Sequence, residues 1–161
     1  MNSLNRTRIR EMPAGSDLFE QAPHLKTIWS PEKTALAAEY AKADAGTGEV
    51  FAITYDKAVV GTTGFFIEPG DPIDTVRLRW TGVIEQYRRR GITRDALTLL
   101  VPKLRAKYPQ CIKILEAVPI NDNGKNFIIP FFTSMGFVPQ GEPYKEDWAD
   151  HMWQDYVWNK E

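Results

Sequence analysis

The strongest restriction on the fold comes from a change of hydrophobic period around three consecutive arginines. Residues Thr75 to Ile84 alternate between apolar and polar side chains, which predicts a strand with one buried face. Beyond the arginines, apolar residues recur at every fourth position, at Ile92, Ala96, Leu100 and Leu104. This spacing predicts a helix, bent where Pro102 removes a backbone hydrogen bond. The segment therefore predicts a strand, a turn and a helix in succession.

The remaining periodic segments add strands and helices on both sides of this turn. Strands are expected at Thr7–Glu11, Val50–Tyr55, Ala58–Ile67, Cys111–Val118, from Phe137 onward and at Met152–Asn159. Helices are expected after a cap at Ser16 or Asp17, from Ser30 to Ala45, and from a cap at Asn126 to Met135. The order predicts an α+β sandwich and not a doubly wound sheet.

The totals indicate one globular domain over residues 1–161, because the sequence has no repeat and no linker. With 43% apolar residues and a formal charge of −1, the chain reads as soluble, and the charge argues against nucleic acid as a partner. No apolar stretch has the length of a membrane span or a signal peptide, so we expect a cytoplasmic protein with no membrane partner. Cys111, His24 and His151 lack metal-ligand spacing, so no metal is expected.

The turn between the predicted strand Thr75–Ile84 and the helix that follows it has the composition of an anion site. Amide groups at a helix N-terminus lack intrahelical acceptors and lie at the positive end of the helix dipole, so they can bind phosphate oxygens. Gly91 permits close approach of the backbone, and Arg88, Arg89 and Arg90 add positive charge. The alternative is that three arginines form a solvated basic face without a ligand.

Two segments resemble motifs of the GNAT superfamily of N-acetyltransferases. Residues 83–93, VIEQYRRRGIT, are similar to its acetyl-CoA signature, in which Arg or Gln is followed by two residues, Gly, one residue and Gly or Ala. Residues 131–137, FFTSMGF, resemble a second motif, in which an aromatic pair on a short helix precedes a Gly-Phe step into a strand. The resemblance implies the GNAT fold, an α+β fold with a mixed, mostly antiparallel central sheet of six to seven strands and about four flanking helices. It also implies a splay between the fourth and fifth strands.

The resemblance also implies acetyl-CoA as the cosubstrate and a set of residues that bind it. The pyrophosphate would be held by the Arg88 side chain and by the backbone amides of Arg89, Arg90, Gly91, Ile92 and Thr93. The pantetheine would pair with Val83 and Ile84 in the splay beside Cys111–Val118, and its far end would lie near Asn126, Phe131 and Phe132. Two further arginines, Arg77 and Arg79, are assigned to the charge of the cosubstrate.

Three residues depart from the family pattern. Thr93 stands where Gly or Ala is usual, and Asp95 adds a negative charge to the first helical turn. Phe132 occupies the position at which many members carry a tyrosine that protonates the leaving thiolate. A thiol has a pKa of about 8.5 and leaves tolerably as the anion, so this loss does not forbid catalysis.

Transfer to an amine needs a neutral nucleophile, and therefore a base or a water path to one. Glu116 ranks first among the carboxylates expected near the splay, although a surface or ion-paired role is the alternative. Ser134 and Tyr144 are candidate replacement acids. The backbone amide near Val83 is a candidate donor to the thioester oxygen.

The C-terminal segment suits a cationic acceptor, because it interleaves aromatic residues with carboxylates between Tyr144 and Trp158. The candidate acceptor-binding residues are Trp29, Glu85, Trp148 and Trp153. The alternative is an aromatic core beside a solvated acidic loop.

The leading hypothesis is an enzyme that moves an acetyl group from acetyl-CoA directly to a primary amine of a small molecule or a protein. The alternative is a non-catalytic acyl-CoA-binding module, which the phenylalanine at position 132 favours. A third interpretation is that the turn binds nothing. A homodimer through the aromatic last strand is left open.

Overall fold

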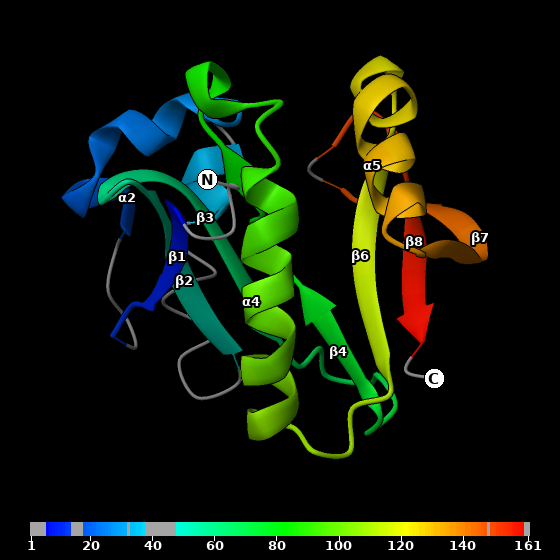
Figure 1. Ribbon diagram of the computed structural model, residues 1–161. Helices are drawn as coiled ribbons and strands as arrows, with labels where there is room; N and C mark the ends of the chain where they lie inside the picture. Colours follow the sequence, from blue (N-terminus) through cyan, green and yellow to red (C-terminus); the bar gives the residue numbers. More distant parts are fainter. Residues whose placement is uncertain (1–5, 14–17, 32, 38–47, 148, 160–161) are drawn as a thin grey trace. The chain divides into compact units, whose positions relative to one another are not determined.

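The computed structural model describes residues 6–13, 18–31, 33–37, 48–147 and 149–159. They form two compact units, one from the described parts of Met1–Ile67 and Arg79–Pro109, the other from those of Glu68–Leu78 and Gln110–Glu161. Both units combine helices with strands (Figure 1), so the predicted α+β class is confirmed. The single domain over residues 1–161 stays a prediction.

The first unit contains an antiparallel sheet in which β2 lies between β1 and β3, and a short strand, β5, also pairs with β3. Its strands are β1 (Thr7–Glu11), β2 (Gly48–Tyr55), β3 (Ala58–Phe66) and β5 (Gly82–Val83). The predicted hairpin between β2 and β3 is confirmed. Its two turn residues, Asp56 and Lys57, have left-handed φ values of 48° and 72°, which match the right-handed twist of the flanking strands.

Helix α4 (Ile92–Lys107) runs without interruption past Pro102 and packs against β1, β3 and β5 (Figure 1). The predicted apolar stripe is confirmed, because its members are at most 2% exposed: Ile92, Ala96, Leu100 and Leu104. Full burial of a leucine or isoleucine contributes about 1.5–3 kcal/mol. This stripe therefore fixes the N-terminus of α4 beside the strands of the same unit.

The earlier helices of this unit are α2 (Leu18–Gln21), a 3₁₀ helix at Pro23–Thr27 and a helix that includes residues 31 and 33–37. The predicted cap is confirmed for the last of these, since the Lys33 amide donates to Ser30 Oγ at 3.2 Å. The rest of that helix, residues 38–45, and the predicted caps Ser16 and Asp17 lie outside the described residues.

The second unit contains four strands in the order β4-β6-β8-β7. They are β4 (Thr75–Leu78), β6 (Lys113–Ile120), β8 (Met152–Asn159) and β7 (Val138–Lys145), seen in Figure 1 with β6 in yellow and β8 in red. Only the β4–β6 pair is parallel. Its ladder ends at Arg77 and Leu115, whereas residues 116–120 of β6 pair only with β8 among the described strands. Strand β6 therefore extends beyond its parallel partner β4.

The prediction of one strand from Thr75 to Ile84 is wrong. After β4 the chain turns at Trp80, whose φ of 55° is left-handed, and β5 then pairs with β3 of the first unit. At the same point the Arg79 amide donates to the Gly64 carbonyl on β3 at 2.9 Å. The change of backbone hand ends the extended ladder and splits one predicted strand into two, which raises the number of described strands to eight.

The prediction that Asn126 caps a helix is also wrong. Residues 122–123 are already helical, and Asn121 caps them by accepting the Gly124 amide on Oδ1 at 2.8 Å. A π-helix, Gly124–Ile128, then leads into α5 (Ile129–Ser134). Pro130 accounts for the wide turn, because its ring would clash with the carbonyl four residues earlier in a regular α-helix.

Candidate functional site

The turn between β5 and α4 has the geometry of an anion-binding concavity. A 3₁₀ turn at Glu85–Tyr87 ends the strand, and the Arg88 amide donates to the Glu85 carbonyl at 3.1 Å. Two left-handed residues follow, Arg89 with φ 63° and Gly91 with φ 76°. Residues that alternate in backbone hand direct successive N–H groups toward one point, which is how peptide backbones surround anions.

The amides of this turn are available to a ligand. The first intrahelical hydrogen bond of α4 runs from the Asp95 amide to the Gly91 carbonyl at 3.0 Å, so the amides of Ile92 and Thr93 have no acceptor within the helix. Within the described parts of the chain, the amides of Arg89, Arg90 and Gly91 donate no backbone hydrogen bond either. The five amides predicted for the pyrophosphate are therefore adjacent and unused by the backbone.

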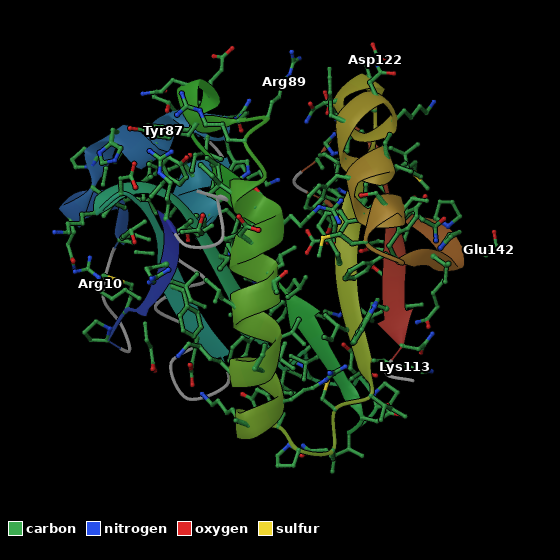
Figure 2. All side chains as sticks on the ribbon, in the orientation of Figure 1. Arg10, Tyr87, Arg89, Lys113, Asp122 and Glu142 are labelled. Carbon is green, nitrogen blue, oxygen red and sulfur yellow. The ribbon has the colours of Figure 1, made fainter. Side chains whose placement is uncertain are left out.

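The three arginine side chains of the turn have different contacts. Arg88 Nε donates to the Val83 carbonyl at 2.9 Å, and Arg90 Nη2 donates to the Gln86 carbonyl at 3.2 Å. The guanidinium of Arg90 also lies 4.9 Å from the centre of the Tyr87 ring. Arg89 is exposed, and Figure 2 shows it at the outer edge of the turn. Two arginines thus brace the turn, and the third faces solvent.

The assignment of Arg77 to the cosubstrate is a poor fit to its contacts. Its Nε donates to Asp71 Oδ2 at 2.7 Å and its Nη1 to Asp155 Oδ1 at 3.2 Å, all within the second unit. Burial lowers the pKa of Arg77, but the hydrogen bond with Asp71 and the charge of Asp155 outweigh it and hold the pKa above its ordinary value. Arg79 instead lies 3.4 Å from the centre of the Phe66 ring.

The strand end that precedes the turn presents one peptide edge away from β3. The Ile84 amide donates to the Val60 carbonyl at 2.9 Å, so Ile84 forms a hydrogen-bonded pair with Val60. In an antiparallel ladder the next residue along the strand points its N–H and C=O to the opposite side. Val83 therefore directs both groups away from β3. Ile84, the other residue predicted to pair with pantetheine, has its amide already bonded to Val60.

Trp29, a predicted acceptor-binding residue, lies next to this strand end. Its ring centre is 5.6 Å from that of Trp80 and 6.0 Å from that of Phe19, both edge to face. A Cβ atom on Gly82 would lie 2.6 Å from Cγ2 of Ile28 and 3.2 Å from Trp29, so a larger residue would force these side chains to move. The ammonium of Lys33 lies 5.6 Å from the same ring, within the range of a cation–π contact.

Asp95 is the one residue of the first turn of α4 that opposes an anion. Its side chain is half-buried, and its Oδ2 atom is shielded from solvent without a hydrogen-bond donor among the described residues. A carboxylate at this place stabilises the helix through the helix dipole but repels phosphate. The unfavourable charge expected from the sequence is thus present beside the turn.

The candidate acids and bases have the following positions. Glu116 is half-buried on β6, opposite Tyr156 of β8, and Glu85 is exposed in the 3₁₀ turn. The Ser134 hydroxyl donates to the Phe131 carbonyl at 2.6 Å. Tyr144 donates to Asp155 Oδ1 at 2.8 Å, and burial, followed by this hydrogen bond, raises the pKa of the tyrosine. Tyr144 is therefore a poor proton donor to a substrate.

The second predicted motif forms an aromatic cluster in the second unit. Phe132 is 4% exposed, and its ring centre lies 5.0 Å from that of Phe131 and 5.1 Å from that of Phe137. Asn126 is exposed in the π-helix, and Gly136 ends α5 with a φ of 96°, as predicted. Phe132 is a packing residue here and carries no hydroxyl.

The predicted residues divide between the two units. The first unit brings together Trp29, Val83, Ile84, Glu85 and Arg88–Thr93, and the second contains Glu116, Asn126, Phe131, Phe132, Ser134 and Trp153. Trp153 is 6% exposed on β8, which fits a core residue, and Trp148 lies outside the described residues. The position of Trp80 beside Trp29 was not predicted, because nothing in the sequence marks a tryptophan as the residue at which the strand turns.

The described residues contain neither a metal-binding cluster nor a membrane-spanning helix. No cluster of three or more histidine, cysteine, aspartate or glutamate side chains there has the arrangement of a metal site. Nor is any described helix both long enough and apolar enough to cross a membrane.

Residues 15–137 match the family model described as the acetyltransferase (GNAT) family. No curated protein sequence is significantly similar to the chain. Among solved structures, a protein assigned to the GNAT family from Desulfovibrio desulfuricans has a TM-score of 0.74 at 17% identity, over 95% of this chain and 98% of its own.

Two other solved structures are similar over most of the chain. A GNAT family acetyltransferase from Elizabethkingia anophelis, with acetyl-CoA bound, has a TM-score of 0.65 at 16% identity, over 97% of this chain and 99% of its own. An acetyltransferase from Salmonella typhimurium that modifies the N-terminal serine of ribosomal protein L7/L12 has a TM-score of 0.67 at 13% identity, over 97% and 96%. At these identities the likeness shows the fold alone.

Proposed function

Since the chain belongs to the acetyltransferase (GNAT) family, we propose that it transfers an acetyl group from acetyl-CoA to a primary amine by direct attack. The observation that carries this proposal is the turn at Arg88 to Thr93. Five adjacent amides at the start of a long helix, beside a strand end with an outward N–H group, suit a ligand that has a pyrophosphate and an extended arm.

In the proposed reaction the nitrogen lone pair of a neutral amine attacks the thioester carbonyl carbon. The new C–N bond forms, the C–S bond breaks, and the thiolate leaves while the nitrogen loses a proton. The Val83 amide is proposed as the donor to the carbonyl oxygen, because it points away from β3. Glu116 is proposed as the base, directly or through water, because it lies on β6 just beyond the end of the β4–β6 ladder.

The acceptor is proposed to be a primary amine on a small molecule or a protein. One structurally similar protein acts on a protein N-terminus, which keeps protein amines among the candidates. The aromatic group of Trp29, Trp80 and Phe19 supports a cationic acceptor, since the face of Trp29 already lies near an ammonium group. The cytoplasmic location and a homodimer stay predictions.

A non-catalytic acyl-CoA-binding module is the second candidate. It is favoured by the buried Phe132, which offers no proton to a leaving thiolate. The two candidates share the cosubstrate site and differ in turnover, so one experiment can separate them.

The test is calorimetric titration of the protein with acetyl-CoA, followed by measurement of thiol release on addition of a panel of small amines and N-terminal peptides. Binding with amine-dependent release supports the transferase, whereas binding without release supports the module. Absence of binding would overturn the assignment of the turn.

A matched pair of variants tests the location of the site. Gly91→Glu and Gly141→Glu each add one negative charge to an exposed glycine with nearly the same left-handed φ, 76° and 72°. We expect Gly91→Glu to weaken acetyl-CoA binding at least tenfold, because it places a carboxylate among the phosphate-binding amides. Gly141→Glu should bind like the unmodified protein; equal losses in both would contradict the assignment.

A further inference from the structure

We propose that Arg88 is a positioning residue for the acyl end of the cosubstrate, and not only a phosphate ligand. Through its hydrogen bond to the Val83 carbonyl, Arg88 holds the strand end in the orientation that presents the Val83 amide to the thioester. This inference rests on the proposed function. It adds to that function a link between the two ends of the cosubstrate site.

One peptide unit of the strand end is held from both sides. In a trans peptide, the carbonyl of one residue and the amide of the next point in opposite directions. The amide of the Val83–Ile84 peptide donates to the Val60 carbonyl at 2.9 Å, and the carbonyl of the same peptide accepts Arg88 Nε at 2.9 Å. The plane of this peptide is therefore fixed by β3 on one side and by Arg88 on the other.

The Val83 amide is next to the held peptide along the chain. The Val83 N–H belongs to the preceding Gly82–Val83 peptide, which shares the Val83 Cα atom with the held peptide, so a shift of the held peptide displaces that N–H as well. A hydrogen-bond donor that is displaced by about 1 Å from a reacting group can cost about a hundredfold in rate. Loss of the Arg88 contact is thus expected to act on the chemical step.

Arg88 can contact the phosphate end of the cosubstrate and hold the strand end at the same time. Its Nε is used by the Val83 carbonyl, but its two Nη groups have no acceptor among the described residues. A guanidinium offers five N–H donors in a fixed plane, so the remaining donors can contact phosphate while Nε holds the strand. On the β3 side the strand end is held by the hydrogen bond from the Ile84 amide to the Val60 carbonyl, and Arg88 is the polar contact on the side away from β3.

The test uses two acetyl donors, acetyl-CoA and S-acetyl-pantetheine, which lacks every phosphate. A residue that acts only on phosphate cannot affect turnover of the second donor. We expect Arg88→Ala to lower kcat for both donors by about 10-fold to 100-fold. We expect it to raise KM for acetyl-CoA alone. Unchanged turnover of S-acetyl-pantetheine by Arg88→Ala would overturn the proposal.

Arg88→Gln is the conservative variant that separates the two roles. The side-chain nitrogen of glutamine is the same number of bonds from Cα as Nε of arginine, and it can donate to the Val83 carbonyl but carries no charge. We expect Arg88→Gln to restore turnover of S-acetyl-pantetheine while KM for acetyl-CoA stays raised. If glutamine is no better than alanine with either donor, the proposed hydrogen bond has no positioning role.

Hydrogen exchange tests the same hydrogen bond without substrate, in case S-acetyl-pantetheine is turned over too slowly to measure. Hydrogen exchange at the Ile84 amide should be at least tenfold faster in Arg88→Ala than in the unmodified protein, because one side of its peptide is released. Arg10→Ala removes another exposed arginine of the same unit, on β1, and should leave that exchange and the activity unchanged. Exchange that is equal in all three proteins would contradict the inference.

The failure of this inference differs from the failure of the proposed function. If the unmodified protein neither binds acetyl-CoA nor releases thiol, the function is wrong. If it does both and Arg88→Ala affects only the KM for acetyl-CoA, the function stands and Arg88 is a phosphate ligand alone.

Discussion

Asp95 places two opposed requirements on one residue. In the first turn of α4, its charge stabilises the helix by about 0.3–1 kcal/mol through the helix dipole. The same charge lies beside the turn that is proposed to bind a pyrophosphate, and its shielded Oδ2 atom is poorly screened by water. The residue therefore favours the folded helix at the expense of the ligand.

Replacement of Asp95 with asparagine should separate these effects. We expect Asp95→Asn to lower the Kd for CoA about twofold to fivefold. The substitution removes a repulsion of about 0.3–1 kcal/mol between the carboxylate and the phosphates. The Tm of the free protein should fall by a few degrees at most. Calorimetry and thermal unfolding check both effects, and a Kd that does not change would mean that the phosphates bind elsewhere.

At the scale of elements, α4 carries an internal defect. Pro102 is exposed inside the helix, where it cannot donate to the carbonyl of Thr98 four residues earlier. The Thr98 hydroxyl itself donates to the Arg94 carbonyl at 2.9 Å, a contact that often bends helices. The buried stripe of α4 holds the helix together despite this loss.

We expect Pro102→Ala to raise the free energy of unfolding by about 1–2 kcal/mol. Removal of a proline from a helix interior stabilises the folded state by about 3 kcal/mol. About 1 kcal/mol of this gain is lost, because the unfolded chain without the proline is more flexible. Pro109→Ala, beyond the helix end, has only the second effect and should be neutral or slightly destabilising. Urea unfolding of both variants measures the difference; equal midpoints would show that the proline is not a defect.

The elements that were predicted correctly are those in which the spacing of apolar residues, or the turn between two strands, is regular over consecutive residues. The last strand, the hairpin at Asp56-Lys57 and helix α4 follow from such patterns. The predicted strand through Trp80 failed because alternation continues across a residue whose left-handed backbone is rare for tryptophan. The cap at Asn126 failed because a π turn shifts the start of the helix, and a proline within a helix does not say which distortion it will cause.

At the scale of the whole molecule, the contacts that escaped prediction join distant parts of the sequence. Arg77 pairs with Asp71 and Asp155, and Tyr144 donates to the same Asp155. Nothing local in the sequence marks residues 77 and 155 as partners. The turn at Arg88–Thr93 could be located from the sequence because its amides, glycine and arginines are consecutive, and its role in anion binding stays a prediction. The catalytic and acceptor residues also stay predictions, and they depend on long-range placement.

This network predicts a loss of stability in alkali. The pKa of Tyr144 is raised in the folded protein, first by burial and then by its hydrogen bond with Asp155, so the neutral phenol is favoured. A raised pKa stabilises the fold below the unfolded value of about 10, and that contribution falls as the pH rises further. We expect the stability of the unmodified protein, relative to Tyr144→Phe, to fall by up to about 1.4 kcal/mol per pH unit above pH 10. Urea unfolding between pH 8 and pH 11 checks this, and a difference independent of pH would refute it.

The π turn at Gly124–Ile128 lets the surface before α5 change by deletion of one residue as well as by substitution. A π turn closes with one residue more than an α-helical turn, as in the hydrogen bond from the Ile129 amide to the Gly124 carbonyl. Deletion of a single residue here would restore a regular helix and rotate the preceding turn by about 100° relative to α5. Different side chains would then stand beside Phe131. A gain or loss of one codon could thus alter this surface in an evolving lineage while the aromatic cluster of α5 stays in place.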